Sequence, residues 1–334
     1  MESVRLALKA AEKYEDFSAN REPVAVRVAI LGATSQIARD LVESFAAQSS
    51  QELVLYARRP DVVEQWLTRV GLAGRYAAAD FSAFGPDEHF DAILNFVGVG
   101  DPARAAAMGA TIFDVTLKYD ELALDYVRKH PDCRYLFLSS GAAYGSSFDG
   151  PVDENTKAMV PINNLKPQDW YGVAKLHAEC RHRALAHLPI VDIRVFNYFS
   201  HTQDIDSRAL MTDIMRAIRD KTVLKTSADY IMRDFIHPSD FFNLINVILA
   251  APATNAVVDA YSKAPIDKAT LLAVMQEKFG LQYEILQRSA GVNATGAKPH
   301  YYSLNTQAAD FGYRPSSTSF DGIILEVLNS CHIN

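Results

Sequence analysis

Tyr171 and Lys175 are the side chains of this sequence best placed to move a proton. They lie four positions apart in a helical pattern, so both face the same side of one helix. The charge of Lys175 favours the phenolate and is expected to lower the pKa of Tyr171 from its usual value of about 10. Tyr171 can then act as a general acid or base at a reacting oxygen. Ser140, at the end of a predicted strand, would hold the same oxygen and stabilise its developing charge.

A glycine turn after the first predicted strand is typical of dinucleotide-binding proteins. Gly32 supplies the tight turn, whereas Ser35 and Ala38 stand where two further glycines are expected. The helix that follows presents backbone amides and a partial positive charge to phosphate groups. A plain strand-to-helix turn with a Thr or Ser cap is the alternative interpretation. The residues expected at the cofactor phosphates are Gly32, Thr34, Ser35, Gln36 and Ile37.

Two arginines, Arg58 and Arg59, follow the second predicted strand. NAD sites usually carry an acidic residue there, which binds the ribose 2′-hydroxyl. A guanidinium instead suits a 2′-phosphate, because it stays charged and donates two parallel hydrogen bonds. We therefore expect NADP(H) as the preferred cofactor, with NAD(H) possible. The alternative is that both arginines belong to a solvated turn.

Three further residues at strand ends are expected beside the cofactor. Asp80, with Phe81 next to it, ends the third predicted strand and would accept a hydrogen bond from the adenine amino group. Asn95 comes at the end of the fourth strand, where the backbone would flank the cofactor.

The elements that position these residues alternate between strand and helix, which predicts a doubly wound parallel Rossmann sheet of the α/β class. A change of rhythm after residue 197 predicts a smaller C-terminal α/β substrate-binding lobe. The expected division is an arm over 1–23, a nucleotide-binding domain over 24–196 and about 234–262, and the lobe over 197–233 and 263–334. Strands are expected over 26–31, 53–56, 76–79, 92–97, 135–138, 190–196 and 257–261, and helices over 40–48, 61–70, 111–130, 171–188, 206–220, 238–251, 267–279 and 319–329.

Composition argues against several other classes of protein. The net charge of −7 comes without a cluster of Lys and Arg, so we expect no nucleic-acid partner. Three cysteines, Cys133, Cys180 and Cys331, give neither a disulfide framework nor a metal-ligand pair, which favours a reducing cytoplasm and no metal. No apolar run is long enough to span a bilayer, and residues 1–23 lack the apolar core of a secretory signal.

At this point the chain resembles the extended short-chain dehydrogenase/reductase family, in particular its nucleotide-sugar epimerase/dehydratase branch. The resemblance is carried by Leu138-Ser-Ser-Gly-Ala-Ala-Tyr-Gly145, Trp170-Tyr-Gly-Val-Ala-Lys175, Arg194-Val-Phe-Asn197 and Arg233-Asp-Phe-Ile-His-Pro-Ser-Asp240.

This resemblance implies that Ser140, Tyr171 and Lys175 are catalytic, with the latter two also at the cofactor. It further implies that Asn197 and Arg233 bind the diphosphate of a nucleotide-sugar substrate. The alternative for Arg233 is an ion pair with Asp234 or Asp240. Helices 111–130 and 171–188 resemble those that form the family's homodimer interface.

Departures from the family pattern narrow the expected reaction. Dehydratases of this branch carry Asp-Glu directly after the catalytic residue, and epimerase-reductases carry Cys at the first of those places, but here Gly141 and Ala142 follow Ser140. A reductase or a 4-epimerase remains. The incomplete glycine pattern and the arginine pair favour a dissociable NADPH. We therefore expect an NADPH-dependent reductase of a keto-sugar, in particular a nucleoside-diphosphate 4-keto-6-deoxy sugar. The alternatives are an NAD-dependent nucleotide-sugar 4-epimerase and a non-catalytic cofactor sensor.

Overall fold

The computed structural model describes residues 26–48, 51–99, 105, 107–286 and 298–332, so the predicted arm over 1–23 lies outside the described residues. Its centre is a seven-stranded parallel sheet with the order β11-β6-β5-β4-β1-β2-β3. The order reverses between β1 and β4, the place at which such sheets bind ligands. The strands are β1 (Arg27–Leu31), β2 (Glu52–Tyr56), β3 (Ala77–Ala79), β4 (Ala92–Asn95), β5 (Arg134–Ser140), β6 (Ile190–Val195) and β11 (Ala256–Ala260).

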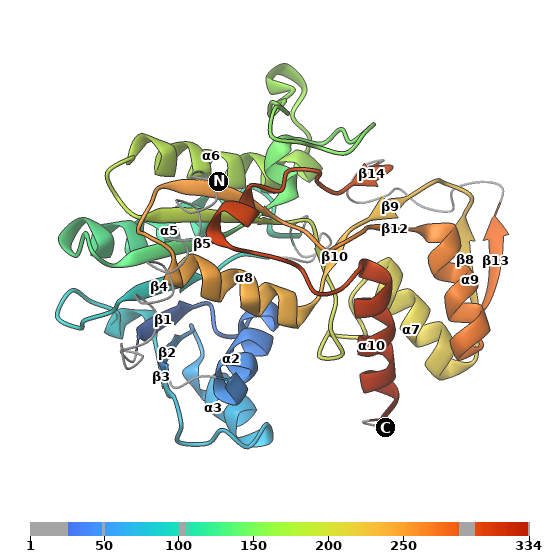
Figure 1. The fold of residues 1–334 in the computed structure, drawn as a ribbon, viewed down its shortest axis with the longest axis horizontal. Coiled ribbons are helices and arrows are strands. Elements are labelled where there is room, and N and C mark those ends of the chain that lie inside the picture. The colour runs from blue at the N-terminus through green and yellow to red at the C-terminus, as the bar shows by residue number, and fades with distance from the viewer. Residues whose placement is uncertain (1–25, 49–50, 100–104, 106, 287–297, 333–334) are drawn as a thin grey trace, which may run out of the picture.

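Helices cover both faces of this sheet (Figure 1). Strand β1 shows why, because Val28 and Ile30 enter one apolar cluster while Ala29 and Leu31 enter the other. A strand that is apolar on both faces must be covered on both. The predicted doubly wound fold is therefore confirmed. One face carries α5 (Thr111–Lys129) and α6 (Trp170–Ala184), and the other carries α2 (Gln36–Gln48), α3 (Pro60–Arg69) and α8 (Pro238–Ala250).

A smaller lobe lies beside the sheet and has its own apolar core (Figure 1). Its helices are α7 (Leu210–Asp220), α9 (Lys268–Phe279) and α10 (Ser319–His332). Short strands complete it and join it to the sheet. They are β7 (Asn197–Tyr198) with β10 (Phe235–Ile236), β8 (Val223–Ser227) with β13 (Gln282–Leu286), and β9 (Met232–Arg233) between β12 (Ile266–Asp267) and β14 (His300–Tyr301).

Several boundaries differ from the sequence predictions, and side-chain hydrogen bonds explain two of them. The helix expected from residue 206 begins at Leu210, because Thr212 Oγ1 donates to the Ser207 carbonyl and stabilises a turn there. The strand expected to reach residue 97 ends at Asn95, whose Oδ1 accepts from the Val97 amide. Strands β13 and β14 lie in chain that was expected to be irregular. No helix among the described residues is long and apolar enough to cross a membrane.

The turn between β1 and α2 requires glycine for two reasons. Gly32 has a φ of 84°, a conformation that L side chains rarely adopt. A Cβ at this position would also lie 2.8 Å from the Val97 nitrogen and 2.9 Å from the Phe96 carbonyl carbon. Both contacts are backbone atoms at the end of β4, so the chain cannot move aside cheaply.

We expect Gly32→Ala to destabilise the protein more than Gly71→Ala does. Gly71 has a similar φ of 75° but no atom within 4 Å of its added Cβ. The Gly71 variant should lose about 1 kcal/mol of unfolding free energy from backbone strain alone. The Gly32 variant should lose about 2 kcal/mol more because of the clash. Urea unfolding of both variants measures the difference, and equal losses would refute the role of the β4 backbone contact.

Candidate active site

The catalytic hydroxyls predicted from the sequence meet at the carboxyl end of β5. Ser140 is the last residue of β5, and its Oγ accepts a hydrogen bond from the Ala142 amide at 3.2 Å. Tyr171, in the first turn of α6, lies close enough to Ser140 for that side chain to lower the pKa of the phenol, against the opposing effect of burial. Gly172 permits this approach, since a Cβ there would lie 2.4 Å from the Ala142 carbonyl oxygen. The absence of a side chain at Gly172 therefore lets α6 pack close to Ser140.

Lys175 lies one helical turn beyond Tyr171 and is only 4% exposed. Its Nζ donates to the Leu138 carbonyl at 2.7 Å and lies 6.0 Å from the centre of the Tyr171 ring. A Cβ placed on Gly98 would be 3.5 Å from the same nitrogen. The ammonium therefore lies between the phenol and the end of β4, where a nucleotide bound to this sheet edge would pass.

The electrostatics of the pair differ from the sequence-based expectation. Burial raises the pKa of Tyr171 above its ordinary value, and the Ser140 side chain opposes this only in part. Burial also lowers the pKa of Lys175 to about 8. The lowering of the Tyr171 pKa that the sequence predicts is therefore not found, because desolvation of the phenol raises this pKa. Tyr171 stays protonated at neutral pH, as a proton donor must.

A second phenol, Tyr301, occupies the same site and was missed from the sequence. Its hydroxyl lies 3.2 Å from Ser140 Oγ, and its ring packs against Phe148 and Phe196 at centroid distances of 4.8 and 5.2 Å. Strand β14 brings it there by pairing with β9, which sets Tyr301 directly beside Arg233. Burial raises the pKa of this phenol as well. Its chain segment shows no hydrophobic period that could have predicted the contact.

Two cations border Tyr301. The Arg233 guanidinium lies 5.7 Å and the Lys298 ammonium 4.7 Å from the centre of its ring. Burial lowers the pKa of Arg233 to about 10, and burial together with Arg233 lowers that of Lys298 to about 8. Neither makes an ion pair with any carboxylate in the described parts of the chain. Buried cations without acidic partners are suited to an anionic ligand.

The neighbouring carboxylates and Asn197 have structural partners. Asp234 accepts hydrogen bonds from Ser262 and Ser319, and Asp240 accepts from Ser316 and Ser317, so the alternative ion pairs of Arg233 do not form. Asn197 Nδ2 donates to the Asp234 and Tyr301 carbonyls at 3.1 and 3.4 Å. The Asn197 side chain thus holds the β14 segment in place and keeps only its oxygen for a ligand.

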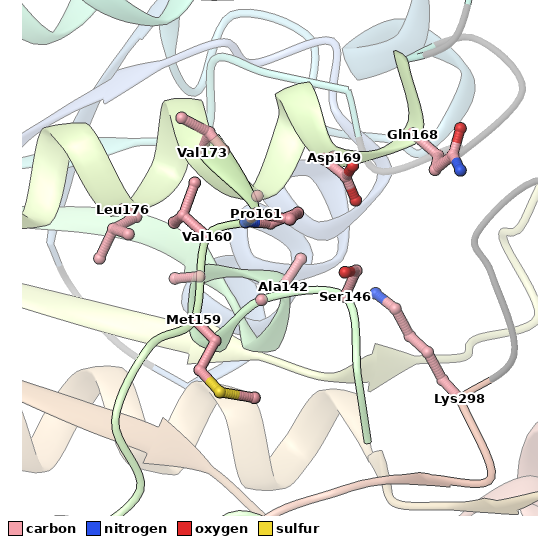
Figure 2. Close-up of a pocket in the computed structure, with 13 residues that line it drawn as sticks. Ala142, Ser146, Met159, Val160, Pro161, Gln168, Asp169, Val173, Leu176 and Lys298 are labelled. Atoms are coloured by element: carbon pink, nitrogen blue, oxygen red, sulfur yellow. The ribbon is translucent and has the colours of Figure 1, made fainter. Parts of the chain in front are cut away.

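A hollow that is open to solvent lies against α6, and about 350 Å³ of empty space, part of it open solvent, lies within it (Figure 2). Its walls come from 142–146, 159–161 and the α6 residues Gly172, Val173 and Leu176. The amine of Lys298 points across its mouth, toward Ser146 and below Asp169 (Figure 2). Lys298 therefore stands between the hollow and the Tyr301 ring.

Gly141, directly after Ser140, has no room for a side chain. A Cβ there would lie 2.4 Å from Cδ1 and 2.5 Å from Cε1 of Phe196, a buried ring. The carboxylate or thiol that other members of the resembled family carry at this place could not be accommodated without moving Phe196. The side chains available for chemistry beside Gly141 are therefore Ser140, Tyr171, Lys175 and the second phenol, Tyr301.

The residues predicted to bind a dinucleotide lie at the carboxyl edge of the sheet, and the cradle fits one. Gly32 brings the turn against β4, and Ala38, fully buried, allows the helix to pack on the strand. Thr34 is exposed, and Ser35 and Ile37 are half-buried at the start of α2. Gln36 is already engaged, since its Nε2 donates to Ser200 Oγ at 2.7 Å.

Among the residues predicted to lie near the adenosine of the cofactor, some side chains likewise have hydrogen-bond partners within the protein and others are exposed. Arg58 and Arg59 directly follow β2, are exposed, and form no ion pair within the described residues. Asp80 is exposed and its Oδ1 accepts from the Ser82 amide, while Phe81 packs 4.4 Å from Tyr119. Among the described residues, no group of three acidic, His or Cys side chains could hold a metal ion.

The side chain of Asn95 has a structural role. Its Nδ2 donates to the Tyr119 carbonyl and to Tyr135 Oη, and its Oδ1 accepts from Val97. Only the backbone around it is free to flank a cofactor, as the sequence prediction supposed.

Comparison with known proteins agrees with this geometry. Residues 28–262 match the model of the NAD dependent epimerase/dehydratase family. No curated protein sequence matches the chain. Similar solved structures include UDP-glucose-4-epimerase from Stenotrophomonas maltophila (16% identity, TM-score 0.76, 92% of this chain and 98% of that chain) and UDP-glucuronic acid 4-epimerase from Bacillus cereus (16%, 0.73, 92% and 100%). A third is dTDP-glucose 4,6-dehydratase from Bacillus anthracis (15%, 0.71, 91% and 96%).

At these identities the structural likeness shows the fold alone, whereas the family model spans most of the chain. The protein therefore belongs to the NAD-dependent epimerase/dehydratase family, the extended short-chain dehydrogenase/reductases, and is an NAD(P)-dependent oxidoreductase by family.

Proposed function

We propose that the protein is an NADPH-dependent reductase of a keto-sugar, most specifically of a nucleoside-diphosphate 4-keto-6-deoxy sugar. The observation that carries this proposal is the proximity of Ser140, Tyr171 and Lys175, beside a glycine whose surroundings leave no space for a carboxylate or thiol at position 141. Such a site can move one proton at one oxygen. It offers no carboxylate for the removal of water.

The bound cofactor would supply the hydride. Tyr171 donates its phenolic proton to the oxygen of the substrate carbonyl, and its raised pKa keeps that proton available at neutral pH. Ser140 donates a hydrogen bond to the same oxygen and stabilises its developing charge. Lys175 holds the nicotinamide ribose and provides positive charge beside the phenol. The rings of Phe148, Phe196 and Tyr301 exclude water from this end of the pocket.

Arg233 is proposed to bind the substrate diphosphate, with Asn197 holding the adjoining backbone. The guanidinium fits this role because it is half-buried and lacks an acidic partner among the described residues. Lys298 adds a second cation at the same ring. Nucleotide sugars are therefore the substrate class that matches the charge of the site, and two of the similar solved structures hold a bound UDP-sugar.

A 4-epimerase is the second candidate. Two of the similar structures are 4-epimerases in complex with NAD, and a 4-epimerase needs the same proton-transferring pair. The two candidates differ in the cofactor, because an epimerase re-reduces its own intermediate and keeps NAD bound. The exposed Arg58 and Arg59 favour the reductase, since they suit a 2′-phosphate.

We expect the purified protein to bind NADPH reversibly and at least about tenfold more tightly than NADH, through charge-assisted hydrogen bonds from Arg58 and Arg59. Calorimetric titration measures both affinities. The double variant Arg58→Ala/Arg59→Ala should lose the preference, whereas Arg69→Ala, an exposed arginine at the other end of α3, should keep it. Protein that purifies already loaded with NAD would overturn the reductase and put the 4-epimerase first.

Replacing Tyr171 by Phe should remove turnover while leaving cofactor binding intact. Loss of the proton donor should lower kcat by about 100-fold or more, and the NADPH affinity should stay within about twofold of the parent protein. NADPH oxidation with a dTDP-4-keto-6-deoxy sugar measures turnover, and calorimetry measures binding. Tyr302→Phe, next to Tyr301 in the chain, serves as the matched control. Unchanged turnover in Tyr171→Phe would refute the mechanism.

A further inference from the structure

A buried histidine lies two helical turns beyond Lys175 and takes no direct part in the chemistry proposed above. His182 of α6 is 0% exposed, and each of its ring nitrogens faces a carboxylate. Nδ1 lies 2.6 Å from Asp192 Oδ1, and Nε2 lies 2.7 Å from Asp120 Oδ1. Both nitrogens must carry protons to donate to these acceptors, so the ring is an imidazolium. We call His182, Asp120 and Asp192 the histidine clamp.

The clamp is enclosed by charged and polar groups from every element packed against it. Tyr135 of β5 donates to Asp120, Arg181 binds Asp120 and Glu121, and Arg183 binds Asp192. Glu179 and Arg194 pair beside it. Asn255 donates to the His182 carbonyl. The clamp contains two negative charges and one positive charge, and the surrounding arginines are only partly buried.

One aromatic ring separates the clamp from the catalytic lysine. Lys175 Nζ lies 4.3 Å from the centre of the Phe137 ring, and the His182 ring lies 5.2 Å from the same ring at 77°. Asp120, Glu179 and Asp192 act on Lys175 through this layer, and they oppose the burial that lowers its pKa to about 8. A change in the charge of Asp120 or Asp192 should therefore alter the pKa of Lys175, and the charge of His182 lies directly between these two carboxylates.

A chain of hydrogen bonds gives a second connection to the site. Asp120 accepts from Tyr135, Tyr135 accepts from Asn95 Nδ2, and Asn95 Oδ1 holds the Val97 amide. Val97 precedes Gly98, on which an added Cβ would lie 3.5 Å from Lys175 Nζ. The clamp therefore fixes the position of the chain at the end of β4, and it also sets the electrostatic field at Lys175.

We propose that His182 is a positioning residue whose fixed positive charge, between Asp120 and Asp192, limits the negative field at Lys175 and aligns the end of β4. This inference rests on the proposed function, because His182 acts only through the Tyr171 and Lys175 pair. It requires no contact between His182 and substrate.

Removal of the positive charge of the clamp and removal of one of its negative charges should shift the pKa of Lys175 in opposite directions. Replacing His182 by Gln leaves the two carboxylates less neutralised, so the ammonium is favoured and the pKa of Lys175 rises above about 8. Replacing Asp192 by Asn removes one negative charge, so the same pKa falls. Reduction needs the charged lysine, and its alkaline limit should therefore move up in the first variant and down in the second.

The clamp should also make stability depend on pH. Burial lowers the pKa of His182, but the hydrogen bonds to Asp120 and Asp192 outweigh it and raise the value to about 9 in the folded protein. The unfolded value is about 6.5. The stabilisation is thus complete below about pH 6.5 and is lost as the pH rises through about 9. His182→Gln should lack this loss of stability with rising pH.

The test is nitrogen and carbon NMR of the full-length protein, with the Lys175 signal assigned by Lys175→Met and the His182 signal by His182→Gln. We expect one histidine to stay doubly protonated up to about pH 9. The Lys175 midpoint should rise by about half a pH unit or more in His182→Gln and fall similarly in Asp192→Asn. His177→Gln, on the exposed side of the same helix, should change neither.

These measurements need no turnover, so they separate this inference from the proposed function. Midpoints that stay constant, or that move in the same direction in both variants, would overturn the inference even if the protein reduces a keto-sugar. Opposite shifts would support it even if the substrate proves to be different. Should His182→Gln fail to fold, Asp192→Asn and the histidine signal of the unmodified protein still decide the question.

Discussion

The positive charge of Lys175 inside the core is the constraint on which the rest of the active site depends. A buried ammonium is costly unless hydrogen bonds and opposite charges compensate it. Here the Leu138 carbonyl binds it directly, and three carboxylates, from α5, α6 and β6, oppose its deprotonation. Those carboxylates are buried too and need cations of their own, which α6 and β6 provide. The chemistry of one lysine therefore shapes the whole polar layer between the sheet and α6.

Local patterns were sufficient to predict the central sheet and the proximity of Tyr171 and Lys175. Strand β1 is apolar and buried from Val28 to Leu31, and consecutive apolar residues are typical of a strand that is covered on both faces. Tyr171 and Lys175 face one side of a helix by geometry alone, so their spacing predicted their proximity. The tight turn at Gly32 could be predicted for the same reason, because the backbone conformation of this glycine is a property of the turn that contains it. The predicted division into domains stays a prediction.

The remaining parts of the site depend on contacts between distant segments, which no local period records. Tyr301 reaches Ser140 through pairing of β14 with β9, and it lies 161 positions away in the chain. The hydrogen bonds that the side chains of Asn95 and Asn197 donate likewise depend on partners that are distant in the sequence. The pKa of Tyr171 could not be judged from its neighbours in sequence, since burial of the phenol is a property of the folded pocket.

The contact between Gly141 and Phe196 ties the type of reaction to the shape of the substrate pocket. Phe196 fills the space of any side chain at 141, and the same ring packs against Tyr144, Phe148 and Tyr301. A lineage of this protein that acquired a new acid or base at 141 would first have to replace Phe196 by a smaller residue and so loosen the packing with Tyr144, Phe148 and Tyr301. A change in the type of reaction would therefore require a variant protein whose substrate selectivity is already altered. A single substitution at position 141 would rarely give a functional protein.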